Sequence, residues 1–329
     1  MILRAVRWIV LVLVWLVGLG GIAWAFGAIH YDFPAWKSAV ALVFIVALGA
    51  AVVWLRGPWK RLGAVFAAFA VVLGWWLMLK PTNEGQWQPD VAQLAWAEIN
   101  GDVVTLHNVR NCDYRSESDF TPRWERRVVR LSQITGIDLA ITYWGSPWMA
   151  HPIVSFQFSD ALPVCFSIET RKQIGQTYSA IGGLYRQFAL IYIVADERDV
   201  IRLRTNYRHG EDVYLYRTTA TPAQARERFQ EYLNSLGALR IHPRWYNAIT
   251  TNCTTGIRAQ RPPGKRLPWD WRLLLNGKAD ELMYQQRALA TAGLPFAELK
   301  QRARINPAAK AANDTADFSK QIRASLPGF

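Results

Sequence analysis

Two stretches decide the fold: HPIVSFQF at residues 151–158 and VCFSIE at residues 164–169. In both, apolar side chains alternate with mainly polar ones, which is typical of β-strands with two unlike faces. A hairpin that buries both apolar faces together has only one possible register parity. We therefore predict Phe156 opposite Val164, with a three-residue turn at 159–161.

This register places a histidine and a carboxylate on the polar face of the hairpin. The remaining predicted pairs are Val154–Phe166, Ser155–Cys165, Ile153–Ser167 and His151–Glu169. A carboxylate beside an imidazole fixes the tautomer of the ring and stabilises the imidazolium, as a general base requires. The alternative is a surface His151–Glu169 pair that contributes little.

A cysteine at the start of a short helix is the candidate nucleophile. Either Thr251 or Asn252 can cap this helix, so Cys253 falls in the first turn. Unpaired amides and the helix dipole favour the thiolate there, and the thiolate is the nucleophilic form. The alternative is a buried structural cysteine. His242 is a rival base, but its turn-like context and local separation make it the weaker candidate.

Three nearly uncharged stretches precede these motifs, at residues 8–29, 39–55 and 62–79. Each is long enough, or nearly so, to cross a bilayer core of ~30 Å as a helix. Their uniform apolarity argues against a helical hairpin in a soluble core, and the two later spans argue against a cleaved signal peptide. We predict three transmembrane helices.

The charges of the short loops predict the orientation of these helices. Positive charges precede the first span and separate the second from the third, whereas the loop 30–37 holds one Lys and one Asp. Cytoplasmic loops are enriched in Lys and Arg, so we expect a cytoplasmic N-terminus and an extracytoplasmic chain after residue 80.

The net charge of +13 for 329 residues invites a nucleic-acid interpretation. However, no arginine-rich tract is interleaved with exposed aromatic residues, so anionic phospholipid is the preferred electrostatic partner. Three cysteines are too few for a disulfide framework, although Cys112 and Cys165 would pair if they met in space. No cluster has metal-ligand spacing, so we predict neither a metal nor another cofactor.

The predicted fold class is α+β, with a transmembrane region (1–80), a linker (81–98), a catalytic domain (99–262) and a helical C-terminal extension (263–329). Its antiparallel sheet contains further strands at 102–110, 124–131, 188–194, 200–204 and 213–216, and a helix runs from the Thr221 cap to Gly237. Arg204, on one of these strands, is expected to hold a phosphate or carboxylate, or to form a sheet salt bridge.

Several motifs together resemble a known family: residues 148–158 with Ala-His-Pro, 166–171, 203–205, 245–247 and 252–255. This set is similar to the Lnb N-terminal periplasmic domain family, also called DUF4105, and to permuted papain-like NlpC/P60 and lecithin-retinol acyltransferase enzymes. The resemblance implies a cysteine acyltransferase of the bacterial inner membrane with a periplasmic domain. It also implies lipoprotein N-acylation with phospholipid as the acyl donor, although here all predicted spans precede the domain.

We therefore expect a membrane-anchored acyltransferase or lipid hydrolase that works through an acyl-thioester on Cys253. His151 is the expected base and Glu169 its orienting carboxylate. The expected substrate-binding residues are Asn252, Thr254, Arg204 and Ser167. The expected partners are the bilayer and a phospholipid or lipoprotein substrate. The alternatives are an NlpC/P60-like cell-wall peptidase and a non-catalytic domain that binds lipid or an envelope partner.

Overall fold

The computed structural model describes residues 2–261, 264, 266, 268–273 and 275–329. The chain forms two compact units. The first contains Met1–Thr82 together with Tyr178–Phe188, and the second contains Asn83–Thr177 and Ala189–Phe329.

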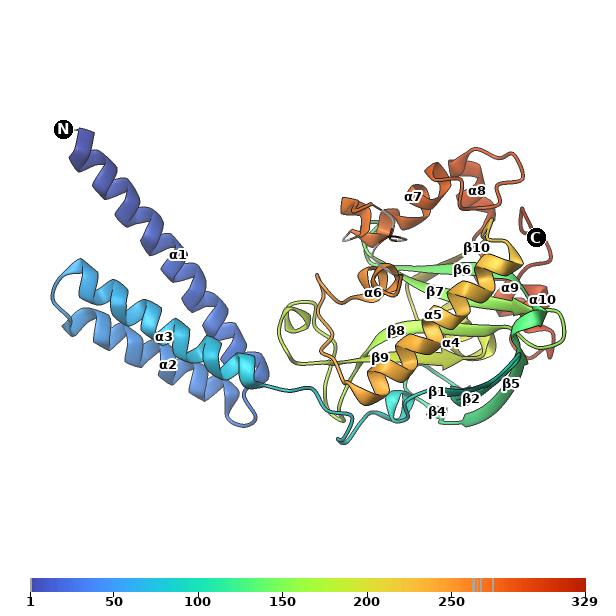
Figure 1. Cartoon of the computed structure of the whole chain (residues 1–329), viewed down its shortest axis with the longest axis horizontal. Helices are drawn as coiled ribbons and strands as arrows, with labels where there is room; N and C mark the ends of the chain where they lie inside the picture. The colour runs from blue at the N-terminus through green and yellow to red at the C-terminus, as the bar shows by residue number, and fades with distance from the viewer. Residues whose placement is uncertain (1, 262–263, 265, 267, 274) are drawn as a thin grey trace. The chain divides into compact units, whose positions relative to one another are not determined.

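The first unit consists of three helices, α1 (Ile2–Asp32), α2 (Lys37–Trp54) and α3 (Pro58–Met78) (Figure 1). Each is long and apolar enough to cross a membrane, as predicted. The β8–β9 connection, Tyr178–Phe188, also belongs to this unit. The backbone N–H of Arg186 in this connection donates to Asp32 of α1. The hydroxyl of Tyr185 lies so close to Gly27 that a Cβ at position 27 would be 2.0 Å from it. A side chain at position 27 would therefore displace Tyr185.

The second unit is built on an eight-stranded sheet in the order β1-β2-β9-β8-β7-β6-β10, with β5 paired to β2. The strands are β1 (Trp96–Asn100), β2 (Val103–Arg110), β5 (Trp124–Arg130), β6 (Ile134–Trp144), β7 (Ala150–Phe158), β8 (Val164–Arg171), β9 (Ala189–Ala195) and β10 (Glu211–Arg217). The short strands β3 (Asp113–Tyr114) and β4 (Phe120–Thr121) pair separately. The sheet is antiparallel except where β2 meets β9, so it is mixed rather than purely antiparallel.

The predicted hairpin is formed by β7 and β8, and its register is confirmed. The observed pairs are Phe156–Val164, Val154–Phe166, Ser155–Cys165 and Ile153–Ser167. The connection spans 159–163 and is longer than the predicted turn. Pro163 stands immediately before β8, where it has no N–H for a ladder hydrogen bond.

Both faces of the hairpin are buried, whereas the alternation predicts one polar face. Phe156 and Phe166 contact Phe229 of helix α5 (Pro222–Ile241), which crosses the front of the sheet in Figure 1. On the other face, Ile153 and Cys165 belong to a core cluster with residues of α4 (Glu197–Arg202), α9 (Asn306–Ala311) and α10 (Phe318–Gln321). The small polar residues of the hairpin therefore point into a covered layer.

Two local predictions are wrong. Residues 200–204 are not a strand: they belong to α4 and to the π-helix η4 (Leu203–Tyr207). Asp196 caps α4 by accepting from the N–H of Arg198, and acidic residues fill the first turn. Helix α5 begins with the predicted capping box at Thr221, but it does not end at Gly237 as predicted. It continues to Ile241.

The expected linker and extension are both part of the second unit. Residues 83–98 include the 3-10 helix η1 (Pro89–Val91), and Val91 is buried. After the cysteine helix α6 (Cys253–Ala259) come the 3-10 helices η6 (Trp271–Leu273) and η7 (Asn276–Lys278), then α7 (Ala279–Gln285), α8 (Phe296–Arg302), α9 and α10. The predicted boundary at 262/263 lies outside the described residues.

Candidate active site

Helix α6 begins at Cys253, as predicted, and Asn252 is its cap. The side-chain oxygen of Asn252 accepts from the N–H groups of Thr254 and Thr255, and Thr255 Oγ1 accepts from the N–H of Asn252 in return. Asn252 is thus committed to the helix rather than open to a substrate. In the described part of the chain the N–H of Cys253 donates to no other residue, which leaves it as the available donor at the start of this helix.

The thiol of Cys253 is buried beside an amide from the C-terminal segment. Nδ2 of Asn276 donates to Sγ at 3.4 Å and to Oγ1 of Thr254 at 3.1 Å. Burial raises the pKa of the Cys253 thiol, and this outweighs the opposing effects of Thr254, of its own N–H and of Arg204. The helix start favours a thiolate, as expected, but burial opposes it and shifts the balance toward the neutral thiol.

His151 is held by a hydrogen-bonded chain that includes Ser167. Nε2 of His151 lies 2.7 Å from Oγ of Ser167, and this hydroxyl donates to Oε1 of Glu169 at 2.7 Å. The direct distance from His151 Nε2 to Glu169 is 3.8 Å, so the predicted contact runs through Ser167. Ser167 is fully buried and has no surface for a substrate.

This chain fixes the tautomer of His151. An ionised carboxylate only accepts, so the single hydroxyl proton of Ser167 goes to Glu169, and Ser167 Oγ must accept from His151. The proton of the neutral ring therefore sits on Nε2, and Nδ1 carries the free lone pair. Nδ1 makes no hydrogen bond to another described residue.

Arg204 keeps Glu169 ionised in this buried setting. Its guanidinium lies 3.2 Å from Glu169 and 3.5 Å from Glu211. Burial alone would raise the pKa of Glu169, but Arg204, Arg110 and His151 hold it well below its usual range. Burial and Arg204 lower the pKa of His151 to about 3. At neutral pH the imidazole is therefore neutral, and the same burial and positive charge make it a weak base in this state.

The predicted residues thus form two bonded groups. His151, Ser167, Glu169 and Arg204 are linked to one another by hydrogen bonds and an ion pair. Cys253 and Thr254 share the amide of Asn276 at the start of α6, and Gly256 of this helix lies against Ile168 of β8. Asn276 connects the groups, because its Oδ1 accepts at 2.8 Å from the N–H of Ala150, the residue before His151.

Asn276 is absent from the sequence-based predictions. The sequence feature that could have drawn attention to it is the Asn-Gly pair at 276–277, which is typical of a tight turn. A Cβ on Gly277 would lie 2.3 Å from the carbonyl oxygen of Pro147. This close approach seats η7 against the loop before β7 and brings Asn276 to the thiol.

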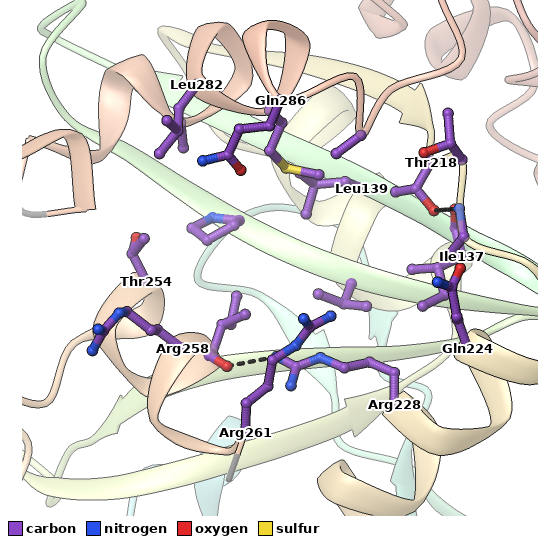
Figure 2. A pocket seen from close by; sticks show the side chains of 18 of the residues that line it. Ile137, Leu139, Thr218, Gln224, Arg228, Thr254, Arg258, Arg261, Leu282 and Gln286 are labelled. Carbon is purple, nitrogen blue, oxygen red and sulfur yellow. Dashed lines mark hydrogen bonds between the residues drawn. The ribbon is translucent and has the colours of Figure 1, made fainter. Parts of the chain in front are cut away.

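A cavity of ≈ 400 Å³ lies between α5, α6 and α7, and the residue after Cys253 is part of its wall. Its floor includes Leu139 and Val154, and Thr254 belongs to its wall. Figure 2 shows Arg258 on the α6 side and Leu282 on the α7 side. Further lining residues are Ile137, Pro152, Ile257, Leu273, Ala279 and Met283. Most of the exposed lining surface is apolar, although charged side chains such as Arg228, Glu231 and Arg261 also border the cavity. Thr254 shares the Asn276 donor with Cys253.

Comparison with known families matches residues 120–277 to the model described as the Lnb N-terminal periplasmic domain. These residues belong to the Lnb N-terminal periplasmic domain family. The predicted resemblance to this family is confirmed, and the matched segment contains Cys253, His151, Glu169 and Asn276. No curated protein and no solved structure matches the chain. The family and the three apolar helices indicate a membrane-anchored protein with a periplasmic domain.

The other sequence candidates lie apart from the thiol of this Lnb-family domain. His242 is exposed at the end of α5. Cys112 and Cys165 are both free and buried, so the disulfide that the sequence left open is not formed. Arg204 shares the carboxylate of Glu211 with Arg208, which also contacts Glu117.

We predict that Ser167→Ala releases the tautomer of His151 in this Lnb-family domain. Without the hydroxyl, Nε2–H loses its acceptor, so the Nδ1–H form becomes populated. The expected result is a mixed tautomer in the ¹⁵N chemical shifts of the ring. Any His151-dependent reaction should slow by about 10–100-fold. Ser155→Ala is the matched control, because Ser155 is equally buried on β7 but bonds Glu197. An unchanged ¹⁵N spectrum in Ser167→Ala would contradict the tautomer assignment.

Proposed function

We propose that the protein is a thiol acyltransferase or lipid hydrolase of the bacterial inner membrane. Its N-terminus would lie in the cytoplasm and its second unit in the periplasm. The observation that carries this proposal is the apolar cavity whose wall includes the residue after Cys253. A cavity of this kind suits an acyl chain, whereas a peptide substrate needs an open cleft with polar partners.

In the proposed reaction, Sγ of Cys253 attacks the ester carbonyl of a phospholipid. The S–C bond forms, the thiol proton passes to Nδ1 of His151, and the C–O bond to the lysophospholipid breaks as its oxygen takes that proton. An amine or water then attacks the thioester and regenerates the thiol. A lipoprotein N-terminus would be such an amine. Because thiol and imidazole both rest neutral, the proton would move during the attack and not in a preformed ion pair.

The described geometry supports particular roles around this centre. The N–H of Cys253 would bind the developing oxyanion, because Asn252 already occupies the next two amides. Asn276 would hold the thiol toward the start of β7, where His151 is the second residue of the strand. Ser167, Glu169 and Arg204 would orient that ring, and Thr254 would border the acyl chain.

Two other functions remain as outcomes of the test. A cell-wall peptidase would use the same cysteine and histidine on a peptide. A non-catalytic lipid-binding domain would use the cavity alone.

The test uses the full chain in proteoliposomes whose phospholipid carries an alkyne on one acyl chain. We expect a covalent label on the protein that survives denaturation and is released by neutral hydroxylamine, as a thioester is. Cleavage of a synthetic cell-wall peptide without any acyl label would identify a peptidase. Neither reaction, with saturable retention of unreacted phospholipid, would identify a binding domain.

A further inference from the structure

Five large apolar side chains are exposed beside the site. They are Trp148, Met149, Trp269, Trp271 and Leu275, with exposed fractions from 44% to 64%. We call this set the apolar collar. Its members come from two short segments, one immediately before β7 and the other immediately before η7. Exposed apolar side chains that gather in this way mark an interaction surface rather than ordinary surface scatter.

Specific contacts hold the two segments of the collar together. The rings of Trp148 and Trp271 lie 6.4 Å apart, and Nζ of Lys278 lies 5.4 Å from the Trp148 ring. The N–H of Gly277 donates to the carbonyl oxygen of Trp148 at 3.0 Å. Since Gly277 tolerates no side chain there, the segments have a fixed relation and form one surface.

The collar is continuous with the catalytic groups and the cavity. Leu275 precedes Asn276, whose amide bonds the thiol, and Met149 precedes Ala150, whose N–H bonds the same amide. Trp271 shares the 3-10 helix η6 with Leu273, which lines the cavity. A molecule seated on the collar therefore lies next to both.

We propose that the collar inserts into the interfacial layer of the phospholipid bilayer and delivers a lipid to the cavity that Thr254 and Leu273 line. Tryptophan prefers the membrane interface, since its ring is apolar and its N–H is polar. Three membrane-spanning helices on the same chain keep a bilayer within reach. Residues 81–329 also carry 31 basic and 24 acidic side chains, a net of +7 that suits anionic headgroups. The delivery step rests on the proposed function, whereas the insertion does not.

Spin labels test the insertion without reference to catalysis. Trp148→Cys and Trp269→Cys, each labelled with a nitroxide in the full chain in phosphatidylcholine–phosphatidylglycerol liposomes, should collide more with oxygen than with a water-soluble nickel chelate. Ser118→Cys, exposed in the β3–β4 connection, is the control and should show the reverse. The three native cysteines are buried, and their background is measured in the unsubstituted chain. Nickel accessibility at 148 and 269 equal to that at 118 would overturn the proposal.

A rate ratio tests the delivery. For Trp269→Glu and Trp271→Glu we measure acyl labelling from bilayer phospholipid and from a water-soluble short-chain ester. The ratio of the two rates should fall about tenfold or more, which corresponds to ~1.4 kcal/mol of lost interfacial binding. An unchanged ratio would overturn delivery by the collar. If the unsubstituted protein reacts with neither substrate, the proposed function fails, and the spin labels alone decide on the insertion.

Discussion

Replacement of Cys253 by alanine should abolish the hydroxylamine-sensitive acyl label that phospholipid leaves on the protein. The expected loss is at least ~10³-fold, because without Sγ no side chain at the start of α6 can form the thioester. The fold should survive, since alanine keeps the helix start and Asn252 still caps it. The measurement is gel fluorescence after coupling of a dye to the alkyne lipid, with the melting temperature recorded for the same sample.

The chain offers matched controls for this loss. Cys112 and Cys165 are also free and buried, and burial raises the pKa of both thiols as it does for Cys253. Cys112→Ala and Cys165→Ala should therefore keep the label. Persistent labelling of Cys253→Ala, or its loss in either control, would remove Cys253 from its proposed role as nucleophile.

Local patterns predicted the part of the site that depends on neighbouring strands. Period-2 alternation determined the β7–β8 register, and that register brings His151, Ser167 and Glu169 to one face. The cap at Asn252 and the helix start at Cys253 were equally visible, because capping residues act within a few positions. These features need only contacts between residues close in sequence.

The missing parts of the prediction depend on distant segments. The alternation pattern predicted one polar face for the hairpin, whereas this face is buried. The residues that cover it belong to α4 and α10, which follow the hairpin in the chain and do not enter a local pattern. Asn276 reaches the thiol from a segment that looked like a separate extension. The raised pKa of Cys253 has the same origin, since burial is a tertiary property while the capping motif is local.

A buried ion cluster under the sheet should make Arg323 the most sensitive residue of the C-terminal segment. Nε of Arg323 lies 2.9 Å from Asp138 and NH1 lies 2.8 Å from Glu197, and both carboxylates are fully buried. Removing one partner of a buried pair typically costs 3–5 kcal/mol, because the other charge stays unpaired in a dry layer. For Arg323→Met we expect a melting temperature about 6–20 °C lower in detergent.

A second substitution, which removes the unpaired charge, shows why Arg323→Met lowers the melting temperature. If the unpaired carboxylate causes it, then Glu197→Gln added to Arg323→Met should recover about half of the lost stability or more, because Gln keeps the shape and can still bond Ser155. If lost packing causes it, the second substitution should recover nothing. Arg302→Met is the matched control: Arg302 pairs with Glu298 at the exposed surface, where such a pair contributes about 0–1 kcal/mol. Equal melting temperatures for Arg323→Met and Arg302→Met would show that the C-terminal segment does not stabilise the sheet through this cluster.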